Sequence, residues 1–78
     1  MRDRIMKIVS EICNDRIVLK NGDLDLFETG LLDSMSFIEM LVLLEEEFDI
    51  LIKPEDIDKE KMNTPNRIVE YVIKKING

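Results

Sequence analysis

The sequence predicts an all-α fold: a small bundle of four helices, three long and one short, with a long loop between the first and second. Apolar residues recur at helical spacing in separate segments. Turn-forming residues are scarce, with 3 glycines and 2 prolines among 78 residues, whereas an all-β fold needs many turns. Because 45% of the residues are hydrophobic, we expect residues 1–78 to form a single globular domain.

The first helix is expected from about Arg2 to Cys13. Its apolar residues follow the i, i+3, i+4, i+7 spacing of one helical face: Ile5, Ile8, Val9 and Ile12. Cys13 is the only cysteine, so no internal disulfide can form and a reducing compartment is indicated. We interpret Cys13 as a small buried hydrophobic residue, since no activating neighbour is evident.

A long loop is expected from Asn14 to Leu32, followed by a second helix that begins at Asp33 or Ser34 and ends near Phe48. The loop is long for a compact helical domain. Its apolar residues are suited to packing into the core: Leu24, Leu26, Phe27, Leu31 and Leu32. We therefore expect a loop pinned to the bundle and leading directly to Ser34.

Two further helices are expected in the C-terminal part. A short one starts at Pro54 and covers Glu55, Asp56 and Ile57. The last one starts after Thr64, a good N-cap, with Pro65 in its first turn. It carries an apolar stripe of Ile68, Val69, Val72, Ile73 and Ile76. The run Ile50–Ile52 could form a strand by propensity, but without a convincing pairing strand we expect an apolar connector.

Negative charge is concentrated in one part of the chain. The net charge is −6, and the segment from Asp23 to Ile52 holds nine acidic residues and no Lys or Arg. Nucleic-acid binding is therefore not expected, and a partner with a basic patch is expected. The sequence shows neither a signal-peptide pattern nor an apolar run that could span a bilayer. We expect a cytoplasmic protein without direct membrane insertion.

Ser34 is the main candidate for a functional residue, as a helix cap or as a site of modification. Catalysis is not expected, because the chain has no histidine for a Ser-His-Asp triad and no Gly-x-Ser-x-Gly motif. A metal site is not expected either. Capping by Asp33 or Ser34 would explain the motif. A phosphate ester on Ser34 would also be favoured by the positive end of the helix.

The second helix is expected to present an outer face that the core does not need. At 100° per residue, its inner face comprises Phe37, Met40, Leu41, Leu44 and Phe48. The outer face presents Met35, Glu39, Val42 and Glu46, with Leu43 at its margin. Apolar anchors among carboxylates indicate a docking surface, and scattered surface hydrophobic residues are the alternative. The C-terminal end of this helix, where the helix dipole favours cations, carries four acidic residues instead: Glu45, Glu46, Glu47 and Asp49. This placement suggests either a functional site or a solvated acidic face.

At these residues the sequence resembles the carrier-protein family, which includes acyl, peptidyl and D-alanyl carriers. Asp33-Ser34-Met35 matches the family's Asp-Ser-apolar motif at the start of the second of four helices. The segments Leu26–Leu32 and Leu44–Phe48 match before and after it. The resemblance implies a carrier-protein-like bundle in which Ser34 bears 4′-phosphopantetheine, with Asp33 as a flanking motif residue. The thiol of that group would hold the cargo as a thioester.

Within the family, the chain is most similar to the D-alanyl carriers of teichoic-acid D-alanylation. The segment Asn63–Val69 and the run Phe48–Leu51 contribute to this similarity, whereas Ser36-Phe37 and Met62 depart from the pattern. The implied partners are a phosphopantetheinyl transferase, an AMP-forming D-alanine (or other amino-acid or fatty-acid) ligase and a membrane acyltransferase, with the carrier acting as a monomer. The alternatives are a stand-alone acyl or peptidyl carrier for fatty-acid, polyketide or non-ribosomal peptide synthesis, and an acidic helical adaptor without a prosthetic group.

Overall fold

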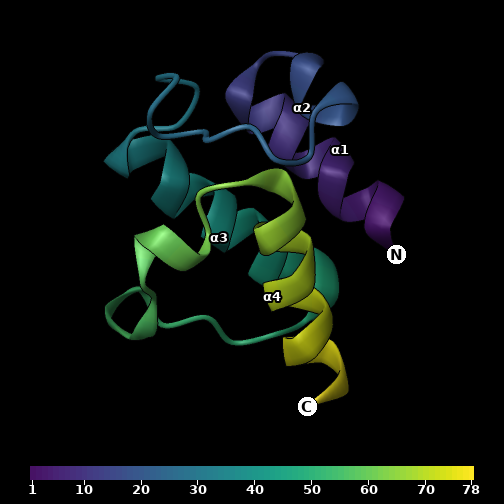
Figure 1. Ribbon diagram of the computed structural model, residues 1–78. Helices are drawn as coiled ribbons and strands as arrows, with labels where there is room; N and C mark the ends of the chain where they lie inside the picture. The colour runs from purple at the N-terminus through teal and green to yellow at the C-terminus, as the bar shows by residue number, and fades with distance from the viewer.

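Helices and 3-10 turns form the fold in the computed structural model, which describes the backbone of residues 1–78 and every side chain except that of Asp56. The elements follow in the order α1 (Arg2–Cys13), α2 (Ile17–Lys20), α3 (Ser34–Phe48), η1 (Pro54–Asp56), η2 (Lys59–Lys61) and α4 (Pro65–Asn77) (Figure 1). This all-helical arrangement confirms the predicted fold class, and the bounds of α1, α3 and α4 agree with the prediction. The run Ile50–Ile52 is an irregular connector, as expected.

The short elements differ from the prediction. The long loop contains α2. The Asp15 carboxylate accepts a hydrogen bond at 2.9 Å from the backbone N–H of Ile17, the first residue of α2. Val18 is completely buried and fixes this single turn against the bundle. The short helix expected at Pro54 is a 3-10 turn that ends at Asp56, and a second 3-10 turn, η2, follows it.

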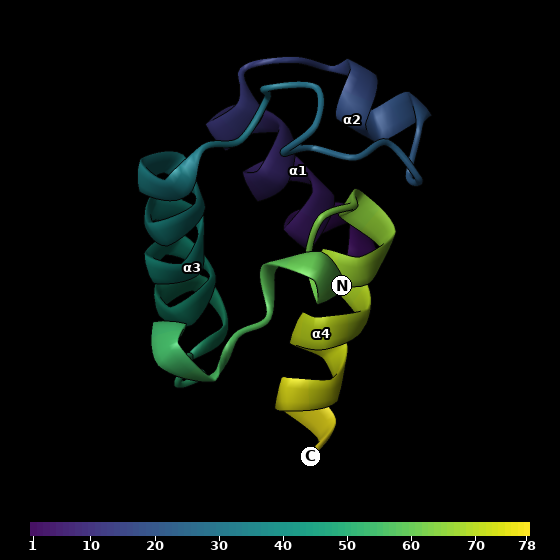
Figure 2. The ribbon, with the colours of Figure 1, turned by 60° about the vertical axis from the view of Figure 1, so that its left-hand side comes forward.

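Helix α1 is the centre of the bundle, because it packs against α2, α3 and α4. Figure 2 shows α3 and α4 on two sides of the molecule, joined by the segment that contains η1 and η2. The buried hydrophobic residues come from every α-helix and from the connecting segments. They are Ile5, Met6, Val9, Cys13, Val18, Leu26, Leu32, Phe37, Met40, Leu41, Leu44, Ile52, Met62, Ile68, Val69 and Val72.

The buried face of α1 is rotated slightly from the predicted stripe. Ile5 and Val9 are completely buried as expected, but Ile8 and Ile12 are only partly buried against the core. Met6 and Cys13 are buried with them, because α1 packs against three neighbours and must bury more than one narrow stripe. The interpretation of Cys13 as a buried residue is confirmed.

The loop before α3 is pinned to the start of α4 by two asparagines. The backbone carbonyl of Asn63 accepts a hydrogen bond from the backbone N–H of Leu26 at 2.7 Å. Its side-chain amide donates to the Asp25 carboxylate at 2.8 Å. Asn66 bonds through its backbone N–H to the Gly22 carbonyl at 3.0 Å and through its amide to Asp23 at 3.0 Å. These bonds fix the path by which the chain enters α3.

Candidate functional site

The first turn of α3 is capped by Asp33 and Ser36. The Asp33 carboxylate accepts a hydrogen bond from the backbone N–H of Ser36 at 2.8 Å. The Ser36 hydroxyl oxygen in turn accepts a bond from the backbone N–H of Asp33 at 2.9 Å. This reciprocal pair is a capping box. Of the two capping residues considered from the sequence, Asp33 is therefore the N-cap and Ser34 is not.

The Asp33 carboxylate is held in its charged form by two hydrogen bonds from Ser36, one from the backbone N–H at 2.8 Å and one from the hydroxyl at 3.0 Å. Its pKa is lowered, first by the backbone hydrogen bond from Ser36 and then by the Ser36 side chain. Both bonds favour the ionised carboxylate, because an ionised acceptor binds a donor more strongly. A negative charge therefore lies beside Ser34 at neutral pH.

The Ser34 side chain is exposed at the first position of α3. Its hydroxyl oxygen accepts a hydrogen bond from the Lys59 ammonium at 3.0 Å. The same ammonium lies 5.7 Å from the centroid of the Phe27 ring, within the range of a cation–π interaction. Lys59 was not predicted from the sequence, because 25 residues separate it from Ser34 and no local spacing rule links the two.

The backbone just before Ser34 is held in place by buried side chains and a glycine. Gly30 has φ of +79°, a conformation that residues with a side chain rarely adopt. Leu32 is buried and donates its N–H to the Leu26 carbonyl at 2.8 Å. Phe27 packs edge-to-face on Phe37 of α3, with ring centroids 5.3 Å apart. The loop thus presents the serine from a rigid base.

The outer face of α3 is exposed as predicted. Met35 is 77% exposed and Val42 is 46% exposed, with exposed carboxylates at Glu39 and Glu46. Ile38, which was not predicted to lie on this face, is 42% exposed. We define the α3 face as Met35, Ile38, Glu39, Val42, Leu43 and Glu46. Two shallow hollows follow one another along it from Ser34, and both are lined by Ile38 and Glu39. The inward residues Phe37, Met40, Leu41 and Leu44 are buried, and Phe48 is half-buried.

The acidic end of α3 is partly compensated by α1. Arg4 forms an ion pair with Glu47 at 2.5 Å and lies 5.0 Å from the centroid of the Phe48 ring. Of the four carboxylates that crowd this end, that of Glu47 therefore has a basic partner. Among the side chains that the structure describes, no such ion pair involves Glu46. The Glu46 side chain is exposed on the α3 face.

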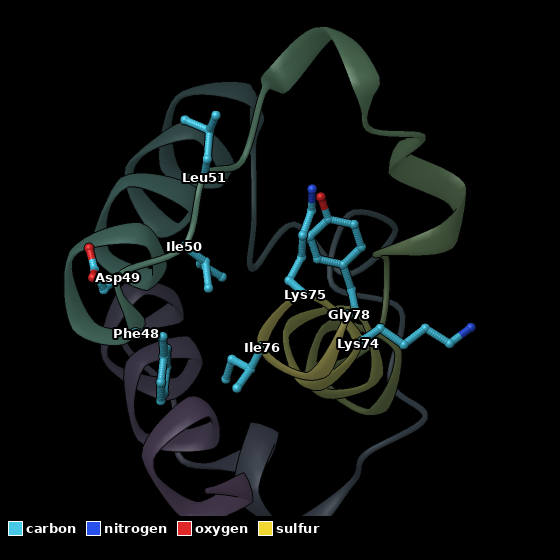
Figure 3. A pocket seen from close by; sticks show the side chains of 9 residues that line it. Phe48, Asp49, Ile50, Leu51, Lys74, Lys75, Ile76 and Gly78 are labelled. Carbon is cyan, nitrogen blue, oxygen red and sulfur yellow. The ribbon is translucent and has the colours of Figure 1, made fainter.

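A groove of about 650 Å³ lies at the opposite end of α3, between the connector and the end of α4. In Figure 3, Phe48, Ile50 and Ile76 face this space, and the Lys74 side chain extends away from it. Helix α3 has 15 residues and is about 22 Å long at 1.5 Å per residue. The groove is therefore separated from Ser34 by the length of the helix.

Among the described residues there is no cluster of His, Cys, Asp and Glu that could hold a metal ion. The Cys13 thiol is buried, and burial together with the nearby Asp15 carboxylate raises its pKa to about 11. A thiol with this pKa is a poor nucleophile at neutral pH.

No helix in the described part of the chain has the length and apolar character needed to cross a membrane.

Comparison with known proteins agrees with the geometry at Ser34. Residues 3–72 match the family described as "phosphopantetheine attachment site". The D-alanyl carrier protein of Bacillus subtilis (strain 168) is 41% identical over 71 residues, which cover 91% of each chain. That of Abiotrophia defectiva is 37% identical over 76 residues, covering 97% of this chain and 96% of the relative. The resemblance seen in the sequence is confirmed, and the chain belongs to the phosphopantetheine-attachment family of non-catalytic carrier proteins.

Proposed function

We propose that Ser34 is the attachment site of 4′-phosphopantetheine and that the cargo is D-alanine, destined for teichoic acid. The observation that carries the attachment site is the exposed hydroxyl at the first position of α3. Asp33 and Ser36 cap the helix, so the Ser34 hydroxyl is not required for capping. The names of the relatives, D-alanyl carrier proteins, support the cargo.

The residues around Ser34 fit a phosphate ester. The hydroxyl lies at the N-terminus of a 15-residue helix, where the dipole favours an anion. The Lys59 ammonium lies 3.0 Å from the oxygen that would become esterified. Once attached, the prosthetic group supplies a thiol at the end of a flexible arm, which can hold an acyl or aminoacyl group as a thioester. The chain's own residues keep the hydroxyl exposed and its backbone fixed.

The α3 face is the proposed docking surface for the enzymes that act on the carrier. It combines exposed apolar side chains with the carboxylates of Glu39 and Glu46, and it starts beside Ser34. Carboxylates around apolar anchors favour partners with basic patches and allow fast exchange between them. The proposed partners are a phosphopantetheinyl transferase, an AMP-forming D-alanine ligase and a membrane acyltransferase. We place the carrier in the cytoplasm, where ATP supports loading, and expect it to act as a monomer.

The attachment site can be tested by intact-mass measurement after incubation with a phosphopantetheinyl transferase and coenzyme A. The wild type should gain one 4′-phosphopantetheine, and Ser34→Ala should gain none. Ser36→Ala is the matched control, because it removes a hydroxyl from the same helical turn and should still be modified once. Modification of Ser34→Ala, or an unmodified wild type, would contradict the proposed site. An unmodified wild type would favour the adaptor alternative.

The cargo needs a separate experiment with the modified protein. Incubation with ATP, a D-alanine ligase and D-alanine should add one alanyl group that hydroxylamine removes, as expected for a thioester. L-alanine should add far less, and modified protein without ligase is the control. If the cognate D-alanine ligase fails while a fatty-acid or other amino-acid ligase loads the carrier, the cargo assignment is wrong and the acyl or peptidyl alternative replaces it.

A further inference from the structure

The Lys59 ammonium is held beside Ser34 by two contacts. It donates a hydrogen bond to the Ser34 hydroxyl oxygen at 3.0 Å and lies 5.7 Å from the centroid of the Phe27 ring. Phe27 is itself fixed by its edge-to-face contact with Phe37 of α3. A flexible lysine side chain is thereby directed toward one oxygen atom, although most exposed lysines are free to move in solvent.

The backbone that carries Lys59 is also anchored. The Asp58 side chain caps η2 by accepting a hydrogen bond from the backbone N–H of Glu60 at 3.0 Å. Met62, directly after η2, is only 1% exposed. The Arg67 guanidinium of α4 donates to the Glu60 carbonyl at 2.6 Å. The turn is therefore tied to the core on one side and to α4 on the other.

Modification of Ser34 would add a negative charge beside the existing carboxylate of Asp33. Phosphopantetheine attachment replaces a neutral hydroxyl by a phosphodiester, which carries one negative charge at neutral pH. The neighbouring Asp33 carboxylate is ionised and already accepts the Ser36 N–H. The segment from Asp23 to Ile52 supplies no basic residue. Lys59, from outside this segment, supplies a cation that already contacts the oxygen that would be esterified.

We propose that Lys59 binds the phosphodiester of the prosthetic arm and so fixes the first bonds of the arm between η2 and the start of α3. This inference rests on the proposed attachment at Ser34. The unesterified phosphate oxygens lie two bonds from the oxygen that Lys59 contacts in the unmodified chain, within reach of its flexible stem. Lys59 acts as a positioning residue, because it holds the root of the arm and does not touch the thiol or the cargo.

The test compares Lys59→Gln with Lys61→Gln. Both residues are exposed lysines of the same 3-10 turn, so the two variants lose the same charge. Lys59→Arg is the conservative variant that should restore binding. Each protein is prepared unmodified and fully modified, with modification verified by intact mass. The readouts are the ³¹P resonance of the phosphodiester as salt is raised, and the difference in unfolding midpoint between modified and unmodified protein.

We expect the ³¹P resonance of the wild type, Lys61→Gln and Lys59→Arg to move with salt, because salt screens the ion pair. The resonance of Lys59→Gln should not move. Modification should change the unfolding midpoint by about 2–4 °C more in the positive direction in Lys61→Gln than in Lys59→Gln. This is the size expected for an exposed ion pair in a domain of this size.

Two outcomes separate failure of this inference from failure of the proposed function. If all proteins are modified at Ser34 but show the same ³¹P behaviour and the same midpoint difference, Lys59 does not bind the phosphodiester. The attachment site then stands and this inference alone is overturned. If the wild type cannot be modified, or is modified elsewhere, the attachment site is wrong and the inference is overturned with it.

Discussion

Reversing the charge of Glu46 tests whether partners recognise the α3 face or only the acidic character of the chain. Glu46 is exposed on that face, whereas the adjacent Glu47 is paired with Arg4. Glu46→Lys and Glu47→Lys each raise the net charge by two units from −6. Successive helical residues differ in direction by about 100°, so the two changes alter different sides of α3.

The expected effect can be estimated from Coulomb's law. A carboxylate about 4 Å from a partner's cation in water contributes about 1 kcal/mol, and reversal adds a repulsion of similar size. The total of about 2 kcal/mol corresponds to a roughly 30-fold fall in kcat/KM for Glu46→Lys. Glu47→Lys breaks an ion pair whose side chains are 57% and 45% exposed. That loss is about 0.2–1 kcal/mol of folding free energy, with little change in kcat/KM.

The assay is the initial rate of phosphopantetheine transfer to the unmodified protein at limiting carrier concentration. Rates are compared at about 0.01 M ionic strength, where the Debye length is about 30 Å, and at about 1 M, where it is about 3 Å. The difference between Glu46→Lys and wild type should shrink at high salt. Equal kcat/KM for Glu46→Lys and wild type at low salt, or an equal loss in both variants, would refute the α3 face as the docking surface.

Three further predictions concern the fold and its ionisable groups. The Cys13 thiol, whose pKa is raised from 9.0 to about 11, should react with Ellman's reagent only after unfolding. Since the buried form is the neutral thiol, its contribution to stability should be complete below pH 9 and lost as pH rises toward 11. Asp33, whose pKa is lowered from 3.8, should stabilise the fold above that pH, and this stabilisation should be lost as the solution is acidified further. Gly30→Ala should lower the free energy of unfolding by about 1 kcal/mol in urea, because φ is positive at this position.

Each of these predictions has a control. Rapid reaction of native Cys13 at neutral pH would show that the thiol is accessible. Asp33→Asn keeps a good N-cap but cannot ionise, so a variant as sensitive to acid as the wild type would remove Asp33 as a cause. Gly30→Asn is the matched variant for Gly30→Ala, because asparagine tolerates a positive φ better. Equal stability of the two variants would contradict a conformational cause.

The long helices could be predicted from the sequence because their ends and faces are encoded locally. Thr64 accepts a hydrogen bond from the Arg67 N–H at 3.2 Å, and Pro65 occupies the first helical position, as the residue types indicate. The stripe that begins at Ile68 is buried at Ile68, Val69 and Val72 and becomes exposed toward Ile76. The signal is strong because a dozen residues share one period.

The short elements could not be predicted in the same way. Helix α2 has four residues, too few for a helical period to be visible. It depends on the burial of Val18 and on a bond from Ile17 to Asp15. The burial of Val18 is a tertiary contact, which the local sequence does not reveal. The hydrogen bond between Ile17 and Asp15 is of a type that occurs in many turns, so it does not indicate a helix. The turn at Pro54 was expected from its proline, but the hydrogen-bond pattern that makes it a 3-10 turn is not encoded by that residue.

In the candidate site, too, local features could be predicted from the sequence and long-range contacts could not. Ser34, Asp33 and every residue of the α3 face except Ile38 could be proposed from the sequence, because they lie within one local motif and one helical surface. The contact between Lys59 and Ser34 joins residues 25 positions apart, and its formation depends on where η2 packs. The hydrogen bonds from Asn63 and Asn66 to the loop before α3 are also long-range contacts. The sequence similarity indicated the segment that contains the two asparagines, but their bonds to the loop were not predictable from spacing.

These long-range contacts explain how so small a chain keeps its serine in a defined position. The loop before α3 has little regular structure, yet Asn63 and Asn66 tie it to the start of α4 at four points. On the other side of Ser34, η2 is tied to α4 through Arg67 and reaches the hydroxyl through Lys59. Both connections lead back to the first turns of α4. The position of the serine therefore depends on a helix that contributes no residue to the α3 face, so changes at the start of α4 should affect the site without altering the docking surface.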